Sequence, residues 1–156
     1  MEDNSKLVGT ALERQVEDAL YVMGVNAVEG IVKYMSKPDF TGKDIVETGR
    51  LRASISFVTP KGEMKAQDRV PQEGDVKNPD NQVQESDYLK GSSGEKRTVI
   101  VGSNVEYASY VDQGTKKLSG DGLETSRPAR QFMKNGIEAA LPKMRSQVED
   151  ILKGGS

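Results

Sequence analysis

Pairs of ionisable side chains are the first candidates for chemistry in this sequence. Glu13 and Glu17 stand one helical turn apart, and so do Glu149 and Lys153. A general acid–base pair needs two such groups, but it also needs a pocket that shifts their pKa values. A solvated helix face has the same spacing without the pocket. We therefore interpret both pairs as surface charges on helices.

A polar, glycine-rich loop offers the next candidates. Ser119 could act as a nucleophile with Lys116 or Lys117, but no strand-to-helix turn of the nucleophile-elbow kind surrounds it. The loop also lacks the GxxxxGK[ST] spacing of a phosphate-binding loop. Asp121 and Glu124 do not have the alternating oxygen ligands of a calcium loop. We therefore interpret this segment as a surface loop.

The composition removes the most familiar catalysts. The chain has 156 residues and no histidine, cysteine or tryptophan, which excludes Ser-His-Asp and Cys-His catalysis, disulfides and the usual zinc ligand sets. With 22 basic and 24 acidic residues, it lacks the charge excess of a protein that grips nucleic acid through a broad basic face. We expect no enzyme activity, no catalytic residue, no cofactor and no metal site.

Five basic residues gather in the sequence near the start of the last predicted helix. A phosphate contact and ion pairs at the surface or between subunits are both open readings, and no interleaved aromatic residue favours single-stranded nucleic acid. These residues are Lys116, Lys117, Arg127, Arg130 and Lys134.

Two tyrosines, Tyr107 and Tyr110, are spaced by three and so share one face of a short helix. Tyrosine rings are common both in a domain's own core and at protein interfaces, because the ring buries area while the hydroxyl finds a partner. The spacing leaves both readings open.

Hydrophobic periodicity predicts three helices. Residues 5–36 carry apolar side chains at intervals of three and four, and Pro38 ends that helix. Residues 105–113 are predicted as a short helix with Asn104 as a possible cap, and Gly114 ends it. The last helix is expected to begin near Ser126, with Pro128 in its first turn and a kink at Pro142.

Two strands are predicted between the helices. In 51–58, Leu51, Ala53, Ile55 and Phe57 alternate with polar residues, which is typical of a half-buried strand. Residues 97–103 form the second strand, and 39–50 and 115–125 are expected to be loops.

The segment 61–96 has a different composition. It holds eight acidic and six basic residues and a single aromatic residue, Tyr88. Such a segment does not form a core of its own. We interpret it as a polar arm or hairpin inserted between the two core strands. An arm that becomes ordered only in an assembly and a mobile loop are both possible.

These elements predict one α+β domain over 1–156, with 154–156 as a tail. Two long helices pack on one face of a small, mostly antiparallel sheet. Two strands alone are marginally stable, so either 61–96 or a neighbouring subunit must complete the sheet. Residues 1–9 lack the apolar run of a secretory signal, and no apolar run reaches the roughly 18 residues that a membrane span requires.

Three sequence segments, in this order, resemble one known family. They are Glu47-Thr-Gly-Arg-Leu-Arg-Ala-Ser-Ile55, then Val101-Gly-Ser-Asn-Val-Glu-Tyr-Ala-Ser-Tyr-Val-Asp-Gln-Gly-Thr115, then Arg127-Pro-Ala-Arg-Gln-Phe-Met133. They resemble the TGxLRxSI, VGxxxxYAxYVExGT and RPF-type motifs of the tail-completion family of tailed bacteriophages, with Asp112 in place of the usual Glu. The residues that carry the resemblance are Thr48, Gly49, Leu51, Arg52, Tyr107, Ala108, Tyr110, Val111, Gly114, Thr115, Arg127, Pro128 and Phe132.

The resemblance implies a structural virion protein of the tail or neck that is made in the host cytoplasm. It implies a tail terminator that forms a ring, commonly a hexamer, at the head-proximal end of the tail. The implied partners are other copies of the chain, the tail tube protein and the head-side connector or stopper. The implied role is to end tube growth and to join the tail to the head, with DNA passing through the ring without specific binding. The motif residues would then be structural or would lie at interfaces.

Two other classes remain open. One is another neck component, such as a head-side stopper, an adaptor or a minor capsid protein. The other is a small non-viral protein, either a regulatory binding module or an enzyme. The place of the chain in an assembled particle would separate the first class from a terminator, and a titratable pocket would favour a chemistry outside the virion.

Overall fold

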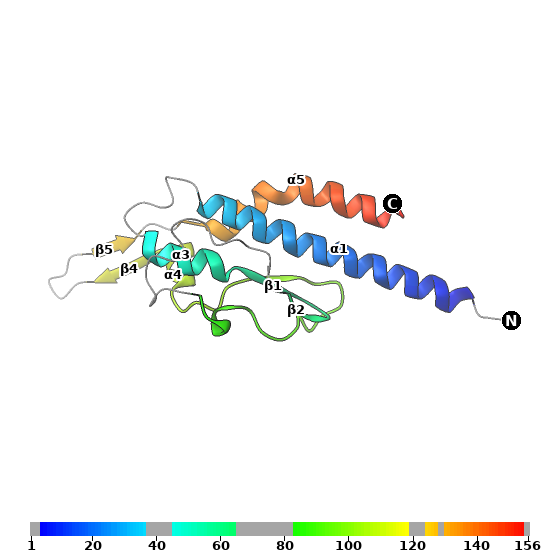
Figure 1. The fold of residues 1–156 in the computed structure, drawn as a ribbon. Coiled ribbons are helices and arrows are strands. Elements are labelled where there is room, and N and C mark those ends of the chain that lie inside the picture. The colour runs from blue at the N-terminus through cyan, green and yellow to red at the C-terminus, as the bar shows by residue number, and fades with distance from the viewer. Residues whose placement is uncertain (1–3, 37–44, 65–82, 119–123, 128–129, 155–156) are drawn as a thin grey trace.

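The α+β class is confirmed by a computed structural model of the chain, which describes residues 4–36, 45–64, 83–118, 124–127 and 130–154. Figure 1 shows two long helices lying side by side, with the strands beside the first of them. The elements in chain order are α1 (Asn4–Met35), α3 (Ile45–Ser54), β1 (Ser56–Thr59), β2 (Gly62–Met64), the 3₁₀ helix η2 (Glu85–Asp87), β3 (Ile100–Gly102), α4 (Ala108–Gln113), β4 (Thr115–Leu118), β5 (Glu124–Arg127) and α5 (Phe132–Leu152).

The packing of α1 against α5 depends on small residues at their crossing. A Cβ atom added to Gly30 would lie 2.3 Å from the carbonyl oxygen of Gly136, and one added to Gly136 would lie 2.4 Å from the Cα of Ile31. The two backbones therefore approach as closely as glycine allows. Near this crossing, Asn26 Nδ2 donates to Gln147 Oε1 at 2.7 Å, and Lys143 pairs with Glu29 at 3.1 Å. The predicted helix 5–36 is confirmed.

The sheet contains three antiparallel strands in the order β2-β1-β3. Phe57, in the central strand β1, is opposite Met64 of β2 and Val101 of β3. The side chain of Phe57 packs on α1, where the ring occupies the space that a Cβ at Gly24 would fill. Helix α1 thus covers one face of the sheet.

The predicted strand 51–58 is wrong in its first half, because 51–54 belong to α3, as do 45–50, which were predicted as a loop. Leu51 and Ile55 are four residues apart, so they fit a helical face as well as a period of two. Ser54 is the residue at which the predicted strand and the structure disagree. It is fully buried, although the alternation of apolar and polar residues placed it at the surface. Its hydroxyl donates to Leu51 O at 2.7 Å and also bonds with Ser103 Oγ.

The second face of the sheet is covered by a strap, residues 84–93, which belongs to the predicted polar arm 61–96. Leu89 N donates to Ser56 Oγ at 2.9 Å, and Ser93 N donates to Thr59 O at 3.1 Å. As a result, all four residues of β1 are buried. Residues 62–64 of the same predicted arm form β2, and 65–82 lie outside the described residues.

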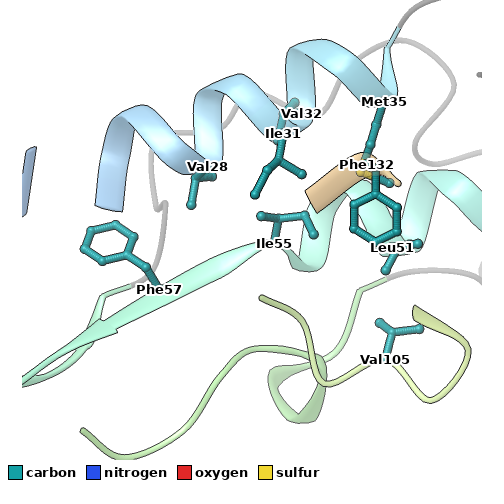
Figure 2. Close-up of a cluster of buried hydrophobic side chains, with 9 residues drawn as sticks. All are labelled: Val28, Ile31, Val32, Met35, Leu51, Ile55, Phe57, Val105 and Phe132. Atoms are coloured by element: carbon teal, nitrogen blue, oxygen red, sulfur yellow. The ribbon is translucent and has the colours of Figure 1, made fainter. Parts of the chain in front are cut away.

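The main core cluster lies between α1, the sheet and the start of α5. Figure 2 shows Phe132 of α5 beside Met35 of α1 and Leu51 of α3, with Phe57 of β1 farther along α1. The cluster contains Val28, Ile31, Val32, Met35, Leu51, Ile55, Phe57, Val105 and Phe132. A smaller cluster, Ala27, Ala140 and Met144, continues between the two long helices.

Several predicted boundaries shift. The second strand covers 100–102 rather than 97–103, and the short helix starts at Ala108 with Tyr107, not Asn104, at its N-cap. Gly114 ends that helix as predicted, with φ of 77°. The predicted loop 115–125 is wrong, because it contains β4 and the start of β5. The predicted kink at Pro142, which lies inside α5, stays a prediction.

The last helix begins at Phe132, so the predicted start near Ser126 is wrong. Ser126 instead lies in β5, opposite Lys116. Pro128, predicted in the first turn of the helix, lies outside the described residues. Among the helices of the described ranges, none is long and apolar enough to cross a membrane.

Candidate assembly surface

The three motif segments meet at one end of the molecule. Leu51 of α3 and Phe132 of α5 are both buried in the main core cluster. Ala108 and Val111 of α4 pack against the same cluster. Segments that are far apart in the sequence therefore form one packed unit, although Thr48 and Gly49 of α3 are described only in their backbone.

Arg52 connects this unit to α1. Its Nη1 donates to the hydroxyl of Ser36 at 3.2 Å, and that hydroxyl donates to Val32 O at 2.7 Å. The motif arginine therefore ties α3 to the last turn of α1. This gives Arg52 a structural role within the chain.

The two tyrosines have different surroundings. Tyr107 is half-buried against the core cluster, whereas the side chain of Tyr110 is 61% exposed. Tyr107 stands at the N-cap with φ of −95° and ψ of 2°, so it precedes the helix that carries Tyr110. The core reading thus fits Tyr107, and the interface reading remains open for Tyr110.

Asp112 caps α5 from another helix. Gln131, at the N-cap position, is left-handed with φ of 46° and supplies no side-chain cap. Met133 N instead donates to Asp112 Oδ1 at 3.1 Å, and Gln131 N donates to Asp112 O at 2.9 Å. Sequence reasoning noted Asp112 only as a variation on the motif, because its partner lies 21 residues away and no local capping signal exists.

Replacing Asp112 with alanine is expected to lower the free energy of unfolding by about 1 kcal/mol, the usual value of an N-cap side chain. Denaturant titration followed by circular dichroism measures the change. Asp150→Ala is the matched control, because Asp150 is exposed in the last turns of α5 and its removal should change stability by less than about 0.5 kcal/mol. An Asp112 variant as stable as the control would contradict the capping role.

A two-stranded ribbon leaves the packed unit at Gly114. Strands β4 and β5 pair antiparallel, with Thr115 opposite Arg127 at the base and Leu118 opposite Glu124 near the tip. Figure 1 shows the ribbon projecting at the end of the molecule opposite the N-terminus. In the described part of the chain, each strand pairs only with the other, so both outer edges are unpaired.

A buried ion pair fastens the strap to α3. Arg50 Nη2 contacts Asp87 Oδ1 at 2.6 Å, and Arg50 Nε donates to Oδ2 at 2.8 Å, so the contact is bidentate. Gln84 N also donates to Oδ2 at 2.8 Å. The hydrogen bond from Arg50, with that from Gln84, holds the pKa of Asp87 below its usual value, although burial opposes this shift. The partners are 37 positions apart in the sequence, so sequence reasoning did not find this pair.

The residues first considered for chemistry do not form a reactive site in the described part of the chain. Glu17 pairs with Lys61 at 2.5 Å, and Glu149 pairs with Lys153 on an exposed helix face. Among the described residues, no cluster of acidic side chains could hold a metal ion. Ser119 and Asp121 lie outside the description, as do the side chains of the lysines beside them and that of Glu124.

The basic residues near the last helix are only partly described. Arg130 N donates to Val111 O at 3.1 Å, which joins the residues before α5 to α4, and Lys134 is exposed. The side chains of Lys116, Lys117 and Arg127 lie outside the description.

Comparisons with known proteins add no relative. No family model, no curated protein and no solved structure matches this chain.

Proposed function

We propose that the chain is a ring-forming subunit of a phage tail terminator. In this role it would end growth of the tail tube and join the tail to the head connector. The proposal starts from the sequence resemblance to the tail-completion family. The observation that carries it beyond the sequence is the projecting β4–β5 ribbon, which grows out of the motif segments.

An isolated two-stranded ribbon is marginally stable in water, and its unpaired edges are templates for pairing with another chain. The motif residues at its base hold it firmly, because Val111 and Phe132 are anchored in the core. Tyr110, exposed on the adjacent helix, adds a large ring of the kind enriched at interfaces. A rigid base with an unpartnered ribbon is the arrangement expected of a subunit that pairs with its neighbours.

The proposal also requires a subunit that does not bind DNA tightly. A ring that DNA crosses should not grip it, and a net charge of −2 is compatible with a lumen that lets the duplex slide. In this proposal, the predicted arm 61–96 is the segment that would reach an adjoining ring. Cryo-electron microscopy of an assembled tailed particle that contains the chain tests its position. Density for the chain away from the head-proximal end of the tail would contradict the proposal.

Replacing Tyr110 with arginine is expected to prevent assembly while changing the free energy of unfolding by less than about 0.5 kcal/mol, because the side chain is exposed. Negative-stain electron microscopy of concentrated protein measures ring formation, and thermal unfolding measures stability. Ser86→Arg, which adds the same charge at an exposed residue of η2, is the control and should assemble normally. Normal rings from the Tyr110 variant would remove this residue from the interface.

A further inference from the structure

The first part of α1 extends beyond the rest of the molecule. Figure 1 shows this end of the helix projecting past α5 and the sheet. Thr10, Leu12 and Arg14 are exposed, and Leu12 is 56% exposed although it continues the apolar stripe of α1. We call residues 9–16 the overhang.

Gly9 in the overhang has no explanation within the described chain. Glycine weakens a helix, and each of the other described glycines inside α1 and α5 allows a close contact, with Phe57 for Gly24 and with the facing helix for Gly30 and Gly136. A Cβ at Gly9 would meet no described atom within 4 Å. Gly9 is also three residues before Leu12, on the same helix face. A helix of another molecule could approach closely there.

A groove between α1 and α5 has the shape and chemistry to receive such a helix. It has a volume of about 380 Å³, and its lining includes three small residues, Gly30, Ala139 and Ala140. Along α1 it runs from Asn26 to Tyr34, which at 1.5 Å per residue is about 12 Å, close to the length of the overhang. Helix-in-groove contacts of this kind place an apolar anchor on the groove floor.

Asn26 supplies an unsatisfied acceptor in this groove. The residue is 3% exposed, and its Nδ2 donates to Val22 O and to Gln147 Oε1, whereas its Oδ1 has no hydrogen-bond partner. Asn26 is among the residues that line the groove. An unpaired buried oxygen is costly, and a donor from a partner would satisfy it once the Asn26 amide turns toward the groove.

We infer that the overhang of one copy docks in the α1–α5 groove of a second copy. Leu12 would pack on the small lining residues, and Gln15, on the same face, carries an amide N–H for the Asn26 oxygen. Glu29 and Lys143 of the groove lining already pair with each other, which leaves Lys33 of the lining as the partner for Glu13 beside Leu12. The two surfaces differ, so the contact is head-to-tail and can close into a ring by rotation. The inference rests on the proposed function for the claim that copies assemble side by side.

The absence of cysteine makes a direct crosslinking test possible. Leu12→Cys and Ala139→Cys variants, mixed at high concentration and oxidised, are expected to form a disulfide-linked heterodimer on a denaturing gel. Within one chain the two positions are too far apart, because Leu12 lies 18 residues, or about 27 Å, along α1 from Gly30, which abuts Ala140. Arg14→Cys is the matched control, since Arg14 is on the opposite face of the overhang and should crosslink at least ten-fold less.

Gly9→Ala provides a second measurement that does not depend on a new cysteine. It is expected not to lower the melting temperature, because alanine favours a helix, yet to reduce the Leu12–Ala139 crosslink several-fold by blocking close approach. Equal crosslinking of Leu12→Cys and Arg14→Cys, or no loss with Gly9→Ala, would overturn the docking. Closed rings without the crosslink would overturn the docking and leave the proposed function standing. Crosslinked open filaments would support the docking and contradict the ring.

Discussion

Replacing Gly136 with alanine is expected to lower the free energy of unfolding by about 3 kcal/mol. The added Cβ would lie 2.4 Å from the Cα and 2.8 Å from the N of Ile31, so it meets backbone that cannot rotate away as a side chain could. Overpacking of this kind typically costs about 1–3 kcal/mol, and the rigid neighbour places Gly136 at the upper end. For a chain of this size the melting temperature should fall by roughly 6–12 °C.

Gly9→Ala is the matched control, because it makes the same chemical change in a helix with no described atom nearby. There the substitution is expected to raise stability by about 0.5–1 kcal/mol through better helix propensity. Thermal unfolding monitored by circular dichroism, with denaturant titration at 25 °C, measures both variants. If Gly136→Ala is as stable as Gly9→Ala, the two helices do not cross as closely as described.

Replacing Arg50 with methionine is expected to cost about 3–5 kcal/mol at pH 7. The change leaves the Asp87 carboxylate, whose side chain is 3% exposed, without its cation. Breaking a buried pair by removing one partner is costly, because the remaining charge is buried and unpaired. The Arg50–Glu106 contact at 3.4 Å contributes little, since Glu106 is exposed. Lys90→Met, which removes an exposed pair with Glu85, is the control and should change stability by less than about 1 kcal/mol.

The effect of Arg50→Met is expected to shrink in acid. In the wild-type chain, the hydrogen bond from Arg50 lowers the pKa of Asp87, so the pair's contribution is fully present above the unfolded value of about 3.9. It is lost as the pH falls below that value and through the folded pKa. Without Arg50, burial favours the protonated carboxyl of Asp87, so it binds a proton at a higher pH than in the wild-type chain and the penalty of the variant shrinks.

Denaturant titrations of both proteins at pH 7 and pH 3.5 measure this difference, and the titration of all other groups cancels in the comparison. A stability difference that stays constant over this range would show that Asp87 does not depend on Arg50 for its charge.

Local sequence patterns predicted α1, α4 and much of α5, because long or well-ended periodic segments have few alternatives. The pattern failed at Leu51 and Ile55, whose spacing fits both a helix and a strand. The structure has a helix at 51–54, in which the buried Ser54 bonds with Leu51 O and Ser103. The alternation of apolar and polar residues indicated a strand only on the assumption that polar residues such as Ser54 face water. The prediction of a loop over 115–125 failed for a related reason, because the polar composition of this segment is typical of a loop. Only the pairing of Thr115 with Arg127, and of their neighbours, makes it a pair of strands.

The candidate assembly surface was predictable as a set of residues but not as an arrangement. The motif segments marked Tyr107, Tyr110 and Gly114, and the helix spacing placed the tyrosines together. The sequence did not show that Tyr107 packs on the core while Tyr110 faces solvent. It also did not show that Asp112 caps a helix 21 residues further along the chain.

The sequence by itself excluded catalysis by histidine or cysteine and determined the long elements. A chain without histidine or cysteine lacks the common nucleophile–base pairs, and the spacing of apolar residues is a local property that each helix carries within it. Only the tertiary structure decided the contacts between distant residues: the Gly30–Gly136 crossing, the Arg50–Asp87 pair and the strap over β1. The physical reason is that glycine, arginine and aspartate have no fixed local preference for such roles. Their contribution depends on which backbone or charge the folded chain brings to within a few ångströms of them.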